Sequence, residues 1–346
     1  MNFQEILAQY WRPAFFAFGL SGLLTTIAIQ IFPQFGLIDR PLLYGLKRKP
    51  IPYYGGIAIF LAFIVSVLIF VPISRQLVGL LVGALMIAAI GFWDDSKRIS
   101  PLLRIGFHFL AALILVWSGI GILSVNIPFL GIIDMSAPLV GAIFTIFWVM
   151  AIVNTMNFVD GVSGLTSGIG FISGLTLFIL SIHPGLHVDP QSQIGVATIA
   201  LIVAMISLAF LIFDFPRPAI LMGDTGSTLL GFVIATLAIF SGGKVATAFL
   251  VLGIPILDMI WVVLRRLWSG QKFWKGDLKH LHHRLLDLGL SERMVILIYL
   301  GVTAFFGFTS VVLVDSRQKL FMIIALGLMM LLLAVALVFG GRRRMD

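Results

Sequence analysis

Apolar stretches recur along the whole chain, separated by short polar segments that hold most of the charged residues. A helix needs about 20 apolar residues to cross the hydrocarbon core of a bilayer, and most of these stretches approach that length. We therefore expect an all-α polytopic integral membrane protein, folded as a single domain over residues 1–346. The eleven predicted spans cover residues 13–32, 54–73, 76–93, 103–120, 137–156, 165–182, 194–213, 227–240, 245–264, 294–314 and 320–339.

The composition excludes an ordinary soluble domain, because 60% of the residues are hydrophobic, 11% are charged and the mean hydropathy is +1.11. The chain has no cysteine, so disulfides, thiolate nucleophiles and cysteine-bound metals are excluded. The first apolar stretch has neither the basic start nor the small-residue cleavage site of a signal peptide. We expect it to be retained as the first helix.

The basic residues are distributed very unevenly between the two ends of the predicted helices. Only Arg12, Arg75, Lys244, Arg317 and Lys319 fall on one side, out of 23 lysines and arginines. Because basic loops stay in the cytoplasm, we expect the N-terminus outside and the C-terminus inside. The cytoplasmic loops are then residues 33–53, 94–102, 157–164, 214–226 and 265–293. The net charge of +8 is explained by this topology, and no basic domain for nucleic acid is left.

Two adjacent carboxylates, Asp94 and Asp95, follow the uncharged third span directly. A helix ends in partially negative carbonyl groups, so two carboxylates there are unfavourable unless a cation offsets them. Lys97, Arg98 and Arg104 supply charge nearby, but a divalent ion can bind a carboxylate and a phosphate oxygen together. A solvated loop after a membrane helix is the simpler alternative for an isolated pair.

Three polar residues at three-residue spacing close the fifth span: Asn154, Asn157 and Asp160. This spacing puts the two amides and the carboxylate on one side of a helix. A helix exit would explain the glycines that follow, but not two amides one turn inside an apolar helix. We therefore favour a functional strip.

A fourth acidic residue, Asp224, lies in LMGDTGS at the start of the eighth span. Asp224 can be an ordinary helix cap, and the free backbone donors there could also receive a phosphate oxygen. Beside Asp94, Asp95 and Asp160 on the same side, metal binding becomes the better interpretation.

Three of the six histidines fall within four residues in the longest hydrophilic loop: His280, His282 and His283, with Arg284 next to them. Imidazole and guanidinium groups bind diphosphate oxygens. Zinc is the alternative, but this spacing is not that of the common structural zinc sites. We favour phosphate binding here, and we expect His108 to be a packed histidine inside its helix.

The first cytoplasmic loop carries Lys47 and Lys49 before PIPYYGG. Anchoring of the membrane helices explains these lysines as well as binding of an anionic substrate does.

Five motifs, PIPYYGG, GFWDDSK, NFVDGVSGL, MGDTGS and HLHHRLLDLGL, follow in order between residues 50 and 290. Together they resemble the polyprenyl-phosphate N-acetylhexosamine-1-phosphate transferases. The last motif is similar to the branch that uses UDP-N-acetylglucosamine, rather than to the phospho-MurNAc-pentapeptide transferases. The chain departs from the family pattern at Ser163 and Ala219, where an aspartate and a lysine are frequent.

The resemblance implies that a polyprenyl phosphate attacks the sugar-bearing phosphorus of a UDP-sugar and releases UMP, as the first membrane step of a cell-envelope polysaccharide. It implies Mg²⁺, with Mn²⁺ as the alternative ion, at the cytoplasmic face of the cell membrane. We assign the metal to Asp95 and Asp224 and the catalytic roles to Asp94, Asp95 and Asp160. A second copy of the chain is a candidate partner. The expected substrate-binding residues are Lys47, Lys49, Lys97, Asn154, Asn157, His280, His282, His283 and Arg284.

Two other classes of function compete with a transferase. Carboxylates near helix ends also mark ion-coupled transporters, which place charge near the middle of the membrane. Here the polar motifs gather on one face, and the outer loops offer no matching site. A purely structural membrane protein leaves the one-sided clustering of Asp and His unexplained.

Overall fold

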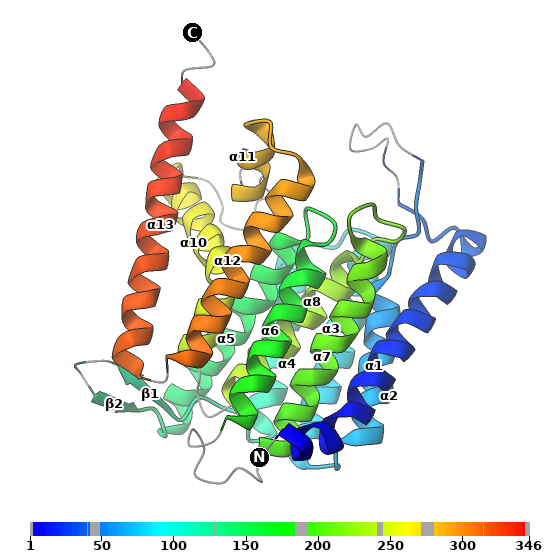
Figure 1. Ribbon diagram of the computed structural model, residues 1–346, viewed down its shortest axis with the longest axis horizontal. Helices are drawn as coiled ribbons and strands as arrows, with labels where there is room; N and C mark the ends of the chain where they lie inside the picture. Colours follow the sequence, from blue (N-terminus) through cyan, green and yellow to red (C-terminus); the bar gives the residue numbers. More distant parts are fainter. Residues whose placement is uncertain are drawn as a thin grey trace.

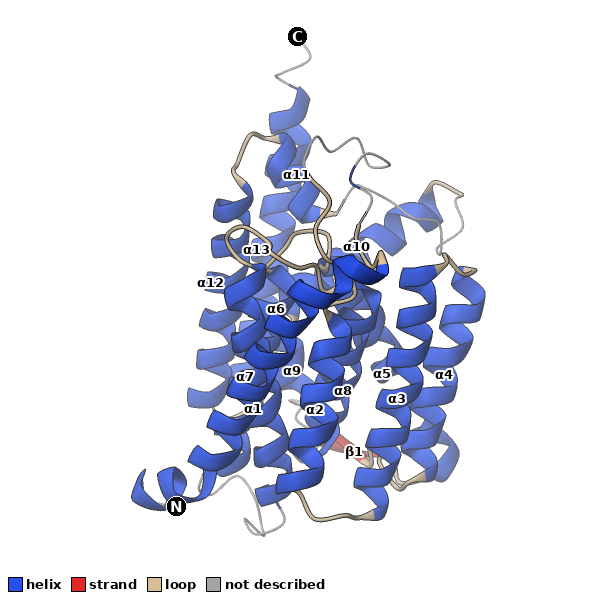
Figure 2. Cartoon of the chain, turned by 90° about the vertical axis from the view of Figure 1, so that its right-hand side faces the viewer, coloured by secondary structure: helices blue, strands red, loops and turns tan. Residues whose placement is uncertain are grey.

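The computed structural model is a bundle of helices with one small hairpin (Figures 1 and 2). It describes residues 3–39, 41, 49–127, 129, 131–183, 193–240, 245–270, 280–313 and 315–342. The short helix η1 (Phe32–Phe35) extends α1, and the strands are β1 (Ser124–Ile127) and β2 (Gly131–Asp134). The helices are α1 (Phe3–Ile31), α2 (Gly56–Phe70), α3 (Arg75–Ser96), α4 (Pro101–Trp117), α5 (Pro138–Val159), α6 (Leu165–Ile182), α7 (Ile194–Asp214), α8 (Gly223–Phe240), α9 (Val245–Val251), α10 (Gly253–Trp268), α11 (Leu281–Asp287), α12 (Glu292–Val312) and α13 (Ser316–Arg342).

Each of the eleven stretches that the hydrophobic pattern predicts as a span contains a helix. Within the described residues, seven helices are long and apolar enough to cross a membrane, and α2 and α4 are shorter apolar helices. The protein is therefore a polytopic membrane protein built from helices.

The predicted ninth span is not one helix but two, α9 and α10, which meet at Leu252. Pro255 has no backbone N–H to donate, and its ring collides with the carbonyl of the residue four positions earlier, Val251. Pro255 therefore favours a break here, and α9 ends at Val251.

Helix α8 runs through the middle of the bundle, and nearly all of its residues are buried. Glycines let its neighbours approach its first turn closely. A Cβ at Gly56 would lie 2.1 Å from the Gly226 nitrogen, and one at Gly91 would lie 2.6 Å from the Thr225 Cα. These contacts bring α2 and the end of α3 against the start of α8.

The strands β1 and β2 form a short antiparallel hairpin, with Ser124 opposite Asp134 and Ile127 opposite Gly131. It lies at one end of the bundle with the N-terminus, whereas α11 lies at the other end (Figure 1). The ends of α3 and α5 and the start of α8 are at the same end as α11 (Figures 1 and 2). Most of the predicted site residues therefore share one end of the molecule.

Candidate active site

The carboxylate of Asp95 caps the start of α8. One oxygen accepts hydrogen bonds from the Asp224 backbone N–H at 2.8 Å and from the Tyr53 hydroxyl at 3.0 Å. The other oxygen accepts from Thr225, from the backbone N–H at 3.0 Å and from the hydroxyl at 2.6 Å. Burial raises the pKa of Tyr53, and the Asp95 carboxylate acts in the same direction, so the phenol stays a donor. Asp95 therefore holds Asp224 in place, and four donors already occupy its two oxygens.

Its neighbour Asp94 points to a different set of partners. One Asp94 oxygen accepts a hydrogen bond from the Ile99 backbone N–H at 2.9 Å, which closes the turn between α3 and α4. Ser100 then caps α4 by accepting from the Leu103 N–H at 3.2 Å, with Pro101 at the first helical position. This turn folds α4 back so that Arg104, one turn into the helix, faces Asp94.

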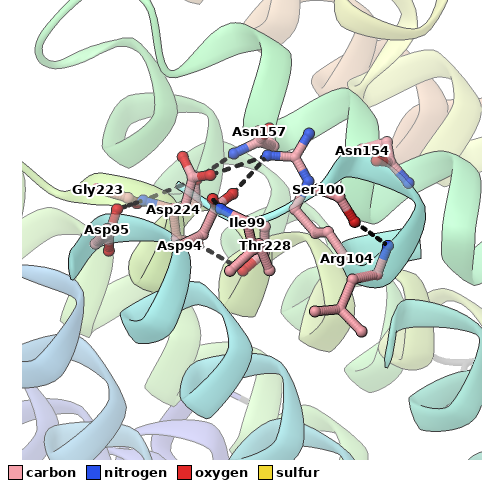
Figure 3. Close-up of polar contacts among 12 residues, drawn as sticks. Asp94, Asp95, Ile99, Ser100, Arg104, Asn154, Asn157, Gly223, Asp224 and Thr228 are labelled. Carbon is pink, nitrogen blue, oxygen red and sulfur yellow. Dashed lines mark hydrogen bonds and ion pairs between the residues drawn. The ribbon is translucent and has the colours of Figure 1, made fainter. Parts of the chain in front are cut away.

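The guanidinium of Arg104 lies between two carboxylates (Figure 3). Its Nη1 atom is 2.9 Å from Asp94 Oδ2 and 3.1 Å from Asp224 Oδ2. The three side chains are 10 to 27% exposed, so they are neither sealed in the protein nor fully solvated. Two carboxylates from different helices thus converge on one cation, although Arg104 and Asp224 are 120 residues apart in sequence.

This convergence fits a divalent cation as well as a guanidinium. Mg²⁺ is commonly held by one or two carboxylates together with substrate phosphates, rather than by a complete protein cage. In the part of the chain that the structure describes, no group of three or more His, Asp or Glu side chains is arranged to hold a metal. Asp94 and Asp224 do supply the two carboxylates that Mg²⁺ commonly uses together with substrate phosphates.

Asn154 and Asn157, near the end of α5, lie beside the same site (Figure 3). The Asn157 amide nitrogen is 3.5 Å from the Ser227 hydroxyl of α8. The Asn154 amide donates to the Met150 carbonyl at 2.7 Å and lies 3.5 Å from a ring nitrogen of His108. His108 is fully buried, as predicted for a packed histidine.

Asp160 follows the last residue of α5. Burial raises the pKa of its carboxyl group well above the usual range, and the neighbouring Asp214 carboxylate raises it further. The Asp224 and Asp95 carboxylates also raise the pKa of Asp160, so Asp160 is close enough to both of them to interact electrostatically.

The histidine segment forms the start of α11. The His280 and His282 rings are parallel, with centroids 5.7 Å apart, and the His282 and His283 centroids are 4.2 Å apart. Burial lowers the pKa of His282 to about 3, so its imidazole is neutral at ordinary pH. Neither of its ring nitrogens has a hydrogen-bond partner among the described residues.

Gly161 connects this segment to the acidic cluster. A Cβ at Gly161 would lie 2.7 Å from His282 Nε2, so the imidazole packs directly on the backbone beside Asp160. The loop after α5 thus joins the histidines of α11 to the carboxylates of α3 and α8.

Other predicted site residues lie elsewhere or outside the described part. Arg284 lines an apolar cavity of about 200 Å³ between α10, α11 and α13. Lys97 is exposed just after α3, and Lys49 is exposed before PIPYYGG. Lys47 lies outside the described residues.

Sequence reasoning gives no site role to four residues that shape this region. Arg104 stands out only as a nearby charge, and Tyr53 and Thr225 have no property in the sequence that marks them as partners of Asp95. Asp258 does have a sequence signature that could have found it, because a carboxylate inside an apolar span is rare and often functional.

Comparisons with known proteins cover the same region. The model of a family described as glycosyl transferase family 4 matches residues 77–242, which include Asp94, Asp95, Asp160 and Asp224. A probable undecaprenyl-phosphate N-acetylglucosaminyl 1-phosphate transferase of Bacillus subtilis is 29% identical over 92% of this chain and 88% of its own length. A decaprenyl-phosphate N-acetylglucosaminephosphotransferase of Mycobacterium leprae is 30% identical over 88% and 82%. An undecaprenyl-phosphate alpha-N-acetylglucosaminyl 1-phosphate transferase of Escherichia coli K12 is 28% identical over 77% and 73%.

Proposed function

The chain belongs to glycosyl transferase family 4, and from this we propose that it transfers N-acetylglucosamine 1-phosphate to a polyprenyl phosphate. The sugar phosphate comes from a UDP-sugar, and UMP is released. The observation that carries the proposal is the convergence of Asp94 and Asp224 on one cation at the end of apolar helices. A lipid phosphate and a water-soluble nucleotide can meet at such a place.

The reaction exchanges one phosphorus–oxygen bond for another. An oxygen of the lipid phosphate attacks the sugar-linked phosphorus, and the bond from that phosphorus to the bridging oxygen breaks. The electron pair of the broken bond leaves with UMP, and the lipid becomes a diphosphate that carries the sugar. Both reactants are anions, so positioning and positive charge supply most of the catalysis.

Asp94 and Asp224 are the residues that we propose to hold Mg²⁺, or Mn²⁺ in its place. The ion, when bound, would neutralise phosphate charge and polarise the phosphorus under attack. The hydrogen bonds of Asp95 favour a different role from the one that the sequence suggested: it orients Asp224 through the first turn of α8. Asp160 and Asn157 border the same site.

The histidine segment is our proposed contact for the donor. His282 is neutral, buried and unpartnered among the described residues, which suits a hydrogen bond to the sugar or the diphosphate. Lys47, Lys49 and Lys97 are proposed to attract the anionic substrates, and Arg284 extends the positive region toward the cavity beside α10.

We further propose eleven spans in a single domain in the cell membrane, with the N-terminus outside and the C-terminus and the active site on the cytoplasmic side. The charge distribution along the chain supports this orientation. UDP-sugars are supplied from the same side.

The direct test is to incubate the purified protein with UDP-N-acetylglucosamine, undecaprenyl phosphate and Mg²⁺ and to measure UMP and the lipid-linked sugar. We expect both products in equal amounts, and neither product without the lipid. Asp224→Asn should reduce turnover about a hundredfold or more, with the variant still folded in detergent, while the exposed hairpin variant Asp134→Asn should retain activity.

The rival functions give different results in the same preparation. UMP formed only with UDP-MurNAc-pentapeptide would move the chain to the other branch of donors. If proteoliposomes containing the protein take up a solute and no UMP is formed, the protein is a transporter and not a transferase.

A further inference from the structure

Asp258 is a buried carboxylate in α10, at 6% exposure, that the reaction as proposed above does not use. Both of its oxygens are engaged by the histidine segment. Oδ2 lies 2.9 Å from His280 Nδ1, and Oδ1 accepts a hydrogen bond from the Leu281 backbone N–H at 2.9 Å. One carboxylate thus contacts both the first histidine and the first residue of α11.

The contact with Leu281 satisfies a backbone donor that the helix itself cannot. The first N–H groups of a helix have no partner inside it, and His280 makes no side-chain cap for α11. Asp258 therefore substitutes for the missing cap from a different helix.

The contact with His280 fixes the arrangement of protons on the imidazole. An ionised carboxylate only accepts hydrogen bonds, so Nδ1 must carry the hydrogen. Nε2 is then the ring nitrogen available for a substrate. The ring is held from the sides as well, parallel to His282 and with its centroid 5.3 Å from that of Phe158 at the end of α5.

We propose that Asp258 is a positioning residue for the donor-binding histidines: it selects the Nδ1–H tautomer of His280 and anchors the start of α11 to α10. The chain of contacts runs from Asp258 to His280, from its ring to His282, and from His282 to Gly161 beside Asp160. This inference rests on the proposed function, because it assigns the histidines to the donor.

A purely structural anchor would not need a charge. Burying a carboxylate costs more free energy than burying an amide of the same shape, and an amide oxygen could accept the hydrogen bond from Leu281 equally well. The amide nitrogen, however, would face His280 and donate to Nδ1, which moves the ring hydrogen to Nε2. Asp258→Asn therefore preserves the anchor and reverses the tautomer.

The first test is spectroscopic and needs no activity. Protein labelled with ¹⁵N-histidine, with His280 assigned by its loss in His280→Ala, should give the Nδ1–H pattern in the wild type and the Nε2–H pattern in Asp258→Asn. An Nε2–H pattern in the wild type, or no change in the variant, would overturn the proposal whether or not the chain is a transferase.

The second test is kinetic. Asp258→Asn should lower kcat/KM for the UDP-sugar about ten- to a hundredfold, as expected for a misaligned contact to a charged group, with an unchanged Tm. The same acid-to-amide change at exposed Asp287, in α11 itself, should have no effect. In a His280→Ala background, Asp258→Asn should cost nothing further, because its effect passes through the imidazole.

If the two substitutions lower kcat/KM independently, so that their effects multiply in the double variant, Asp258 is only a structural residue. If Asp258→Asn is fully active, Asp258 has no positioning role. If Asp258→Asn does not fold, the wild-type tautomer still decides the proposal. A wild type that folds and shows the Nδ1–H pattern but releases no UMP from any UDP-sugar would contradict the proposed function, not the tautomer.

Discussion

Arg104 is the side chain around which the acidic residues are arranged. Its Nη1 atom occupies the point on which Asp94 and Asp224 converge, so the divalent ion that we propose would have to compete with it for the same oxygens. A positive charge already in this place also keeps the two carboxylates together when no substrate is bound. We propose that Arg104 turns toward the substrate phosphate when an ion takes its position.

Removing this charge should affect ion binding and turnover in opposite directions. In Arg104→Gln we expect Mn²⁺, measured by its EPR signal without substrates, to bind about fivefold more tightly, since a competing ion pair is worth about 1 kcal/mol. Transfer should nevertheless fall about tenfold or more. Arg317→Gln is the control for charge, because this guanidinium lies over the ring of Phe129 in the hairpin turn, away from the acidic residues. Weaker Mn²⁺ binding in Arg104→Gln would show that the guanidinium does not compete with the ion.

His282 allows a prediction about pH dependence. Its pKa is lowered to about 3 because burial disfavours the charged ring, so the group is already neutral at every pH above about 5. His282→Asn should therefore reduce kcat/KM about ten- to a hundredfold by losing hydrogen bonds, and leave the shape of the pH–rate profile between about pH 5 and 8 unchanged. The concentration of Mg²⁺ needed for half-maximal rate should stay the same.

Two results would contradict this assignment of His282. Loss of an acidic limb from the profile would mean that the imidazole titrates during turnover. A shift in the Mg²⁺ requirement as large as that of Asp224→Asn would mean that the histidine segment binds the ion.

At the scale of elements, the site depends on how closely α11 approaches the loop between α5 and α6. The imidazole of His282 leaves no space for a side chain at Gly161, and the glycine contacts at the start of α8 do the same for α2 and α3. The histidine segment and the acidic residues are thereby brought together by close contacts at glycine positions.

A single methyl group should separate these elements. Gly161→Ala places a Cβ 2.7 Å from His282 Nε2, so the buried imidazole must move, and we expect KM for the UDP-sugar to rise about tenfold with a smaller change in kcat. The control is Gly106→Ala in α4, where nothing lies within 4 Å and alanine favours the helix. Steady-state kinetics of both variants provide the measurement. If Gly161→Ala and the wild type have equal KM values for the UDP-sugar, the loop and α11 move independently.

At the scale of the whole molecule, the polar site and the hairpin lie at opposite ends of an apolar bundle (Figure 1). The chain has no cysteine, so one introduced thiol reports on one end alone. Asp287→Cys marks the site end on α11, and Ile132→Cys, on a residue 73% exposed in β2, marks the hairpin end.

An impermeant thiol reagent applied to intact cells should label Ile132→Cys and should not label Asp287→Cys until the membrane is opened. The physical reason is that basic loops tend to stay on the cytoplasmic side of a membrane. The reverse pattern would invert the orientation and separate the site from cytoplasmic nucleotides.

The sequence by itself determined which stretches are helical and where the polar motifs lie between them. Membrane spans are local: about 20 apolar residues suffice for each, and the charges between them set the side, so neither depends on distant contacts. For the same reason the motifs around Asp94, Asp160, Asp224 and His280 can be located from the pattern of residues alone. The family resemblance rested on those same residues and was confirmed by the comparisons.

Only the tertiary structure decided which side chains face each other. Successive residues of a helix point about 100° apart, so Asp94 and Asp95 cannot serve one ion from one direction, and nothing in the pair tells which of them turns toward Asp224. Packing directs Asp95 to the backbone of α8 and Asp94 to Arg104. The partnership of Asp258 with His280 likewise joins residues 22 apart in sequence, from α10 to the start of α11, and such a contact exists only once the helices have packed.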